Sequence, residues 1–341
     1  MRSTVISLLF IATLAIGGFV TSAQRSNQGR GQQQQRPNTS PTPPPDDQGD
    51  VIPIATRRVR LPITVLNKKN ELVTGLAAGD FQIYEDKQLQ TIESFAADES
   101  ARQPFYVGVL MDTSASTAGK LKFEREAAMN FIYTVARPRK DRVAFVTFDD
   151  EVNLRQDFTD RMDLLQRAVE GTKKPGNRTS LFDAVYNFCD EKMRSAPGQR
   201  VIVLITDGDD AGSHALLTDA IDIAQRTETV IFAISTKGAF SGTIGGTEMG
   251  QVADRGDKEL ERLCEETGGR AFFTGDILAL ERSFTRIAKE LRAQYVVTYR
   301  STNDVYNGQF RRIEVRLTNK RDGMKVRAKS GYTALAERTA R

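Results

Sequence analysis

The chain has 341 residues, of which 39% are hydrophobic, and this is enough for about two domains with ordinary cores. Its 48 basic residues nearly balance its 44 acidic residues, so the net charge is only +4. Because no block of Lys or Arg stands out from this mixed surface, we expect no nucleic acid among its partners.

The first 23 residues have the pattern of a secretory signal peptide. Arg2 precedes an apolar run over residues 5–20, and small residues follow up to the expected cleavage position after Ala23. The run is short for a membrane span, and no Cys that could carry a lipid lies near Ala23. We therefore predict a secreted or periplasmic protein with no membrane span in its mature chain. An uncleaved anchor is the alternative.

Residues 24–50 are rich in Gln and Pro and poor in apolar side chains. Such a composition cannot bury a core, so we predict a disordered linker that is locally extended around Pro43–Pro45. A proline-binding partner could recognise this segment, but we interpret it as an inert spacer.

Two segments that flank the middle of the chain, residues 51–100 and 294–334, alternate between polar and apolar side chains. Examples are Leu61-Pro-Ile63 in the first and Ile313-Glu-Val315 in the second. This alternation predicts β-strands. Neither flank would bury enough surface by itself. We therefore predict that both flanks together build one small β-sandwich, with residues 104–293 inserted between them.

Within residues 104–293, strand-like and helix-like patterns alternate. The predicted strands cover residues 105–112, 143–148, 201–205, 230–234 and 270–273, and the predicted helices cover residues 120–135, 162–170, 181–194, 215–227, 257–267 and 277–292. This alternation predicts an α/β domain with a doubly wound, mostly parallel sheet and helices on both of its faces.

The first of these strands ends in a carboxylate, Asp112, and two hydroxyls follow it at Ser114 and Ser116. Because ligands bind beyond the carboxyl ends of strands in open sheets, we expect the three oxygens to converge on the first turn. Oxygen-only ligation suits a hard divalent cation such as Mg²⁺. The D-x-S-x-S motif is weak alone, since the same residues also suit a polar turn or a helix N-cap.

Two further segments add oxygens at the same predicted edge. Thr179 opens a predicted helix after Gly176-Asn-Arg178, and Asp207 follows the strand at residues 201–205. Repeated strand–helix units of this spacing would bring the three strand ends onto one face of the sheet.

In these three motifs the chain resembles the von Willebrand factor type A (VWA) domain. The D-x-S-x-S run, the Thr179 loop and Thr206-Asp-Gly208 are similar to that family's metal-ion-dependent adhesion site (MIDAS), in the same order and strand context. The flanks resemble VWA-related secreted proteins common in acidobacteria. The resemblance implies Mg²⁺, with Mn²⁺ or Ca²⁺ as alternatives, held directly or through water by Asp112, Ser114, Ser116, Thr179 and Asp207.

The resemblance also implies a partner. Only Asp112 and Asp207 can offset the charge of the metal, so the ion stays electrophilic and keeps an exchangeable position. In VWA domains that position takes an Asp or Glu carboxylate of a partner protein, which gives metal-dependent adhesion without catalysis. The sequence identifies neither the partner nor the oligomeric state.

Three features near the predicted site allow two interpretations each. Arg178 stands where many relatives have Gly, and it could attract an acidic partner or lie solvated along the surface. Asp209 and Asp210 could widen the site and contact the partner, or form a solvated acidic turn, which we favour. The Gly-rich segment at residues 237–256 could be a lid beside the metal or, as we favour, a surface insertion.

The sequence does not predict an enzyme, and we expect no catalytic residue. With a single His, the chain has no Ser-His-Asp or Cys-His constellation, and it has no phosphate-binding Gly-rich motif. The nearest enzymatic alternative is a Mg²⁺-dependent phosphohydrolase of the haloacid dehalogenase type, but that chemistry needs a second Asp where this chain has Ser114. A metal-independent structural module of the cell envelope is the stronger alternative.

The two cysteines, Cys189 and Cys264, lie on apolar faces of predicted helices. We predict buried free thiols, because a disulfide would need the two helices to be adjacent. We expect the single histidine, His214, at the surface.

Overall fold

The computed structural model describes residues 58–97, 103–117, 121–172, 176–237, 254–273, 277–318 and 323–335. The predicted signal peptide, the predicted linker and residues 238–253 of the Gly-rich segment lie outside these described residues. No helix within the described ranges is long and apolar enough to cross a membrane.

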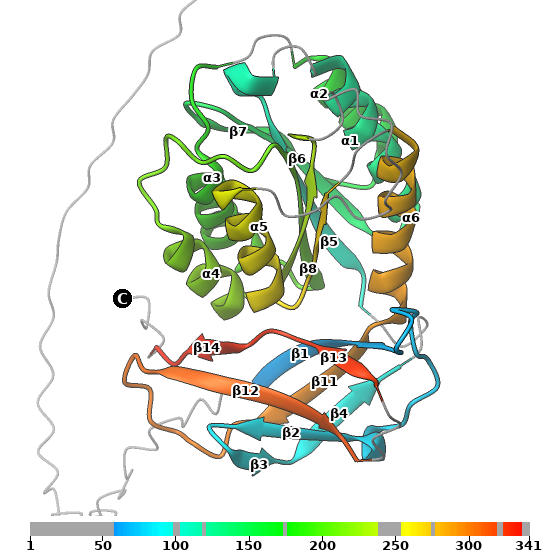
Figure 1. The fold of residues 1–341 in the computed structure, drawn as a ribbon, viewed down its shortest axis with the longest axis vertical. Helices are drawn as coiled ribbons and strands as arrows, with labels where there is room; N and C mark the ends of the chain where they lie inside the picture. The colour runs from blue at the N-terminus through cyan, green and yellow to red at the C-terminus, as the bar shows by residue number, and fades with distance from the viewer. Residues whose placement is uncertain are drawn as a thin grey trace, which may run out of the picture. The chain divides into compact units, whose positions relative to one another are not determined.

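A mostly parallel sheet forms the centre of the domain that lies between the two flanking segments in the sequence (Figure 1). In the described part of the chain its strand order is β10-β9-β8-β5-β6-β7. The strands are β5 (Phe105–Asp112), β6 (Arg142–Phe148), β7 (Val152–Thr159), β8 (Gln199–Thr206), β9 (Thr229–Ser235) and β10 (Ala271–Phe273). All neighbours pair in parallel except β6 and β7, which are antiparallel.

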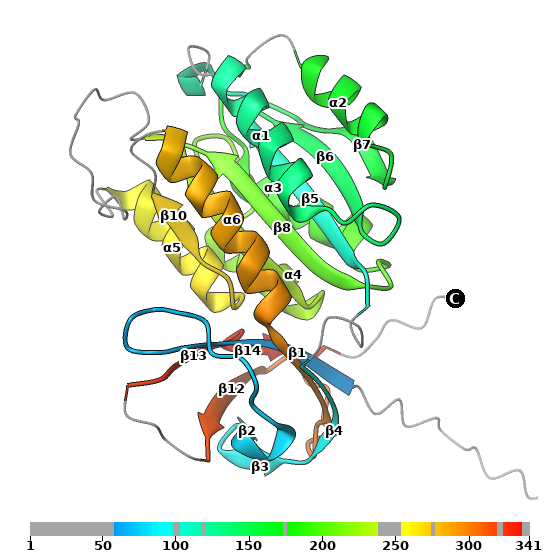
Figure 2. The same ribbon diagram turned by 90° about the vertical axis from the view of Figure 1, so that its right-hand side faces the viewer.

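Helices cover both faces of this sheet (Figure 2). One core packs α1 (Leu121–Val135), α2 (Met162–Glu170) and α6 (Ile277–Ala293) against the sheet, and the other packs α3 (Leu181–Phe188), α4 (Leu217–Arg226) and α5 (Arg255–Glu266). The apolar strands serve both cores, since Val109 and Met111 face the first and Leu110 faces the second. The predicted doubly wound α/β fold is confirmed.

Three short helical turns complete the described elements, and one of them changes a predicted helix. They are the 3-10 helices Ala78–Asp80 and Ala115–Thr117 and the π-helical turn Cys189–Met193. The helix predicted over residues 181–194 therefore ends at Phe188 as an α-helix and continues as a π-helical turn.

The structure differs from the predicted elements of this domain in two other places. Strand β7 was not predicted, because its polar sequence suits an edge strand that packs little apolar surface. Helix α4 begins at Leu217 and not at residue 215. The carboxylate of Asp183 accepts hydrogen bonds from the main-chain N–H groups of His214 (3.1 and 3.0 Å) and Ala215 (2.8 Å), which holds these residues in the preceding loop.

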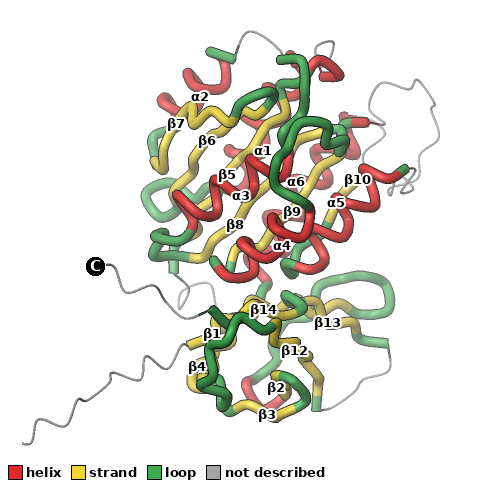
Figure 3. Tube along the Cα trace, turned by 90° about the vertical axis from the view of Figure 1, so that its left-hand side faces the viewer, coloured by secondary structure: helices red, strands yellow, loops and turns green. Residues whose placement is uncertain are grey.

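The two flanks form a β-sandwich, as predicted (Figure 3). One sheet has the order β13-β1-β11-β4 and the other β14-β12-β2-β3. Their strands are β1 (Arg58–Leu66), β2 (Phe81–Glu85), β3 (Gln88–Gln90), β4 (Ile92–Ala96), β11 (Tyr295–Arg300), β12 (Phe310–Leu317), β13 (Lys325–Arg327) and β14 (Gly331–Thr333). Each sheet joins both flanks, because β1 pairs with β11 and β2 pairs with β12. The inward side chains build a third core.

The β-sandwich contacts the central domain where the parallel strands begin. The Ser330 N–H donates to the main-chain oxygen of Glu266 (3.1 Å), and the Gln225 side chain donates to the Ser330 hydroxyl (3.0 Å). Glu266 and Gln225 lie at the carboxyl ends of α5 and α4. Gln294 is the single residue between α6 and β11. These contacts leave the opposite edge of the sheet, where β5 and β8 end, free of the sandwich.

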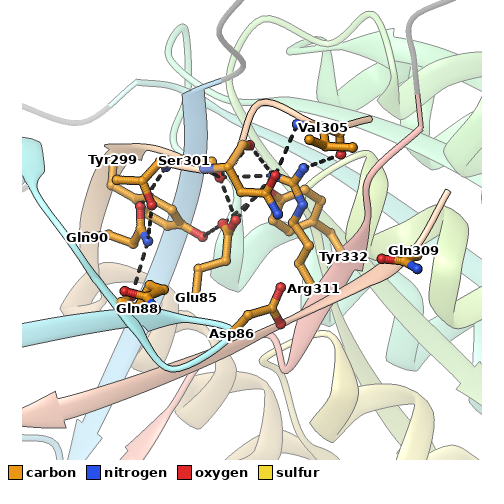
Figure 4. Close-up of polar contacts among 12 residues, drawn as sticks. Glu85, Asp86, Gln88, Gln90, Tyr299, Ser301, Val305, Gln309, Arg311 and Tyr332 are labelled. Atoms are coloured by element: carbon orange, nitrogen blue, oxygen red, sulfur yellow. Dashed lines mark hydrogen bonds and ion pairs between the residues drawn. The ribbon is translucent and has the colours of Figure 1, made fainter. Parts of the chain in front are cut away.

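A buried carboxylate, Glu85, organises the interior of the sandwich (Figure 4). It accepts hydrogen bonds from the hydroxyls of Tyr299 (2.7 Å), Ser301 (2.5 Å) and Tyr332 (3.0 Å). Its ion pair with Arg311 spans 3.2 Å, and the two side chains are only 2% and 3% exposed. Burial and the Glu85 charge raise the pKa of Tyr332 to about 12, so this tyrosine stays a neutral donor.

The guanidinium of Arg311 extends this network to the loop between β11 and β12. It donates to the main-chain oxygens of Asn303 (2.7 Å) and Val305 (2.7 Å). Both charges of the pair therefore have several partners, which offset the cost of removing them from water. The network links four strands of the sandwich to one loop.

We predict that Glu85→Gln destabilises the protein by about 3–5 kcal/mol, because it leaves the Arg311 charge buried without a counter-charge. The double variant Glu85→Gln with Arg311→Met should lose less than the single variant. The matched control is Glu314→Gln, which removes one partner of the half-exposed pair Glu314–Arg316 and should cost less than about 1 kcal/mol. Urea denaturation of the full chain measures all three, and equal costs for Glu85→Gln and Glu314→Gln would contradict the prediction.

Candidate metal site

Strand β5 ends in the buried carboxylate of Asp112, and both of its oxygens are fixed. Its Oδ1 accepts the Ser114 N–H (2.9 Å), and its Oδ2 accepts the hydroxyl of Thr206 at the end of β8 (2.6 Å). The Thr206 hydroxyl in turn accepts the Gly208 N–H (3.1 Å). Asp112 is therefore clamped between the ends of two neighbouring parallel strands.

The two serines of the D-x-S-x-S motif lie side by side. The Ser114 and Ser116 hydroxyls share a hydrogen bond of 2.9 Å, because the 3-10 helix Ala115–Thr117 turns the chain back at this point. Ser114 is buried, whereas Ser116 is exposed.

A second carboxylate, Asp207, lies beside Asp112 and lacks a partner. Asp207 is 5% exposed, and its Oδ1 is buried with no hydrogen-bond partner in the described residues. Burial, with a smaller contribution from the negative charge of Asp207, raises the pKa of Asp112 to about 6. Leaving a buried acceptor unpaired costs free energy, and two adjacent buried carboxylates repel each other. This arrangement favours a cation between them.

The loop that carries Thr179 is attached to the same edge of the sheet. The Gly176 N–H donates to the main-chain oxygen of Thr113 (2.8 Å), directly after β5. The main-chain oxygen of Thr179 accepts the Ala211 N–H (3.0 Å) and the Gly212 N–H (2.9 Å) from the loop after β8. Thr179 itself is 5% exposed. The structure thus brings Asp112, Ser114 and Ser116 together and places Thr179 and Asp207 on adjoining loops.

The loop after β8 packs tightly against the start of α5. A Cβ atom at Gly256 would lie 2.5 Å from Oδ1 of Asp209 and 2.6 Å from the main-chain oxygen of Gly208. Gly208 also has a φ of +90°, a conformation that favours glycine. The position of Asp207 is therefore set by its neighbours as well as by β8.

The charged residues at the rim of this edge differ in their pairing. Asp209 forms an ion pair with Lys237 (3.0 Å), and Lys237 also pairs with Asp254. Arg178 is exposed and forms no ion pair with any described residue. Among the described residues of this rim, Arg178 is therefore an exposed cation without an ion pair.

Sequence reasoning missed the role of Asp210. Its Oδ1 accepts the Leu181 N–H (2.9 Å) and the Ser213 hydroxyl (2.6 Å), so it satisfies the start of α3. Asp209 is exposed, as expected for a solvated acidic turn, although it pairs with Lys237. For Asp210 the expectation was wrong, because its carboxylate accepts hydrogen bonds from within the protein. The spacing between Asp210 and Leu181 carries no local signal that could have revealed this contact.

The other expectations about reactive side chains are confirmed. Cys189 and Cys264 are buried free thiols, and burial raises the pKa of Cys189 to about 12. The His214 side chain is 98% exposed. No cluster of three or more His, Cys, Asp or Glu side chains suited to a metal occurs in the described parts of the chain. The donor set around Asp112 and Asp207, with two carboxylates and several hydroxyls, is of a different kind and suits a hard cation.

Comparison with solved structures found several distant likenesses. An aerotolerance-related membrane protein from Bacteroides fragilis is 14% identical, with 55% of this chain and 98% of that chain covered and a TM-score of 0.43. Proximal thread matrix protein 1 from the mussel byssus is 18% identical, with 61% and 51% covered and a TM-score of 0.46. The PilB minor pilin from Streptococcus sanguinis is 16% identical, with 57% and 62% covered and a TM-score of 0.42. Structural likenesses at these TM-scores indicate nothing about function.

Comparison with curated proteins found no match. A family model does match, over residues 107–286, which is more than half of the chain. That model describes the von Willebrand factor type A domain, and the matched residues include all three motifs around Asp112, Thr179 and Asp207. The chain belongs to the von Willebrand factor type A domain family.

Proposed function

We propose that this chain is an exported, non-enzymatic binding protein whose VWA domain holds a divalent metal and uses it to ligate a carboxylate of a partner protein. The observation that carries the proposal is the buried, partnerless Oδ1 of Asp207 beside the buried carboxylate of Asp112. A divalent cation would neutralise both charges and supply the missing partner.

The residues that would hold the metal are Asp112, Ser114, Ser116, Thr179 and Asp207. Mg²⁺ fits this oxygen-only donor set best, with Mn²⁺ or Ca²⁺ as alternatives. Ser116 is exposed, whereas the other four residues are at most 5% exposed. The open side of the site would therefore lie at Ser116, and a partner Asp or Glu would reach the metal there.

Arg178 would contact the same partner. It follows two loop residues that are held to the strand ends, since the Asn177 N–H donates to Asp150 (2.7 Å) just as Gly176 donates to Thr113. A guanidinium at a fixed position beside the metal would attract acidic residues that flank the ligating carboxylate. Asp209 would contribute less, because Lys237 already pairs with it.

Export rests on the N-terminal sequence. We propose a signal peptide at residues 1–23 and a linker at residues 24–50, followed by β-segments at 51–100 and 294–334 around a VWA domain at 104–293. This layout matches the resemblance to VWA-related secreted proteins of acidobacteria. It would place the metal site outside the cytoplasm.

Two other functions are weaker. A metal-independent scaffold would have no use for the partnerless oxygen of Asp207. A phosphohydrolase would need a second carboxylate where the chain has Ser114. The proposed partner is thus a protein, and no catalytic residue is proposed.

We predict that Asp207→Asn abolishes metal binding and stabilises the metal-free protein. The substitution keeps the shape of the side chain but removes one of two repelling buried charges, which should add about 0.5–2 kcal/mol. In the wild type, Mg²⁺ at 100 times its Kd should add about 2.7 kcal/mol. Calorimetric titration and thermal unfolding, each with Mg²⁺ and Mn²⁺, measure both effects.

The control for this experiment is Asp163→Asn, an exposed carboxylate on α2 that pairs with arginines. It should change neither the metal affinity nor the response of the melting temperature to metal. Failure of the wild type to bind either metal, or a destabilised Asp207→Asn without metal, would favour the scaffold function instead.

We predict that Arg178→Ala lowers the affinity for acidic peptides roughly tenfold while the metal affinity stays unchanged. The loss follows from removing a charge-assisted contact beside the metal. Fluorescence anisotropy in Mg²⁺ with peptides that carry Asp or Glu, and with their Asn or Gln counterparts, measures it. Arg167→Ala, which removes an exposed arginine of α2 that pairs with Asp163, is the control. Equal binding by all three proteins would show that Arg178 is only solvated.

A further inference from the structure

A cavity of about 300 Å³ lies where the β-sandwich meets the start of β8, at the other end of this strand from the candidate metal site. Its floor is the outer face of the β1-β11-β4 sheet, on which Arg60 pairs with Thr298 and Thr298 pairs with Ser94 in register. These three side chains therefore form one polar row across three strands. Gln103 and Gln199 supply the remaining polar part of the cavity wall.

The guanidinium of Arg60 in this cavity has no carboxylate partner among the described residues. It donates to the side-chain oxygen of Gln103 (2.8 Å) and to the main-chain oxygen of Gly198 (3.1 Å), which are both neutral acceptors. The nearby Glu228 accepts the main-chain N–H of Arg60 (2.9 Å) and forms no ion pair with its guanidinium. Burial lowers the pKa of Arg60. The positive charge is partly desolvated, and most of its N–H groups remain available.

Gln199 is a second polar group in the same cavity whose presence needs an explanation. It is the first residue of β8 and is 4% exposed. Its Oε1 is buried and has no hydrogen-bond partner in the described residues. Such a group costs about 1–3 kcal/mol and is rare in native proteins unless water or a ligand satisfies it. A metal at the candidate site cannot satisfy this oxygen, because that site lies at the other end of β8.

We infer that this cavity binds a small carboxylate that carries a further hydrogen-bonding group. The planar guanidinium of Arg60 matches a carboxylate in bidentate geometry. The Gln199 carboxamide supplies both a donor and an acceptor for the second group, and the Ser94 and Thr298 hydroxyls lie beside them. Ala96 and Val296 complete the wall with apolar surface, as in ordinary small-molecule sites.

The carboxylate could belong to a free small acid or to the carboxyl terminus of a peptide. N-acetylglycine represents the shared chemistry, and N-acetylglycinamide is the matched uncharged probe. A short peptide that ends in glycine with a free carboxyl group tests the second source. If the peptide binds as well as N-acetylglycine, the ligand is a chain terminus, and if only N-acetylglycine binds, it is a free acid.

The experiment is calorimetric titration of the full chain with these probes. N-acetylglycine should bind the wild type and the amide should not. Arg60→Met should weaken binding at least tenfold, because it removes the charge-assisted contact. Gln199→Leu should also weaken binding, yet raise the melting temperature of the unliganded protein, since it replaces an unsatisfied buried amide by an apolar group of similar size. A merely structural Gln199 would give a lower melting temperature.

Two controls separate this site from its surroundings. Arg58→Met removes an exposed arginine from the same strand, and Asp207→Asn alters the metal edge, so both should bind N-acetylglycine like the wild type. The proposal fails if the acid and the amide bind equally or if neither binds.

Discussion

The clamp on Asp112 sets the geometry of the whole metal edge. Its two carboxylate oxygens join the turn after β5 to the end of β8, through the Ser114 N–H and the Thr206 hydroxyl. Because the group is buried, its charge is expensive, and Asp207 adds a second negative charge beside it. The fold can maintain such an arrangement because the strands on both sides are fixed by parallel pairing and by two apolar cores.

The two ends of the central sheet serve different purposes. The carboxyl ends of β5 and β8 carry the candidate metal ligands, whereas the β-sandwich contacts the other end through the carboxyl ends of α4 and α5. Helix α6 runs into β11 across one residue, and β11 pairs with β1 on one side and β4 on the other. A buried ion pair between Glu290 of α6 and Arg327 of β13 adds a second link. Any displacement of α6 would therefore have to disturb the sandwich.

The sequence was sufficient for the parts of the fold that local patterns encode. Uninterrupted apolar runs ending in Asp112 and Thr206 identified buried parallel strands, and alternation in both flanks predicted a shared sandwich. Contacts between residues far apart in the chain left no such pattern. Asp210 and Leu181 are 29 residues apart, and Glu85 and Arg311 are 226 apart, so their pairing depends on the folded loops and sheets. Strand β7 was missed because an edge strand pairs with a neighbouring strand on one side only, and its side chains can remain polar.

Buried polar groups in this chain differ in whether the described residues satisfy them. Glu85 and Arg311 satisfy each other and several hydroxyls and main-chain oxygens, so their burial is compensated within the protein. Asp207 and Gln199 are equally buried but each keeps an oxygen without a partner in the described residues. A ligand that supplies the missing partner lowers the cost of such an oxygen. The oxygen of Asp207 would be satisfied by a cation. Gln199 lies next to the Arg60 charge and would be satisfied by a polar anion. The two sites would therefore bind ligands of opposite charge at opposite ends of β8.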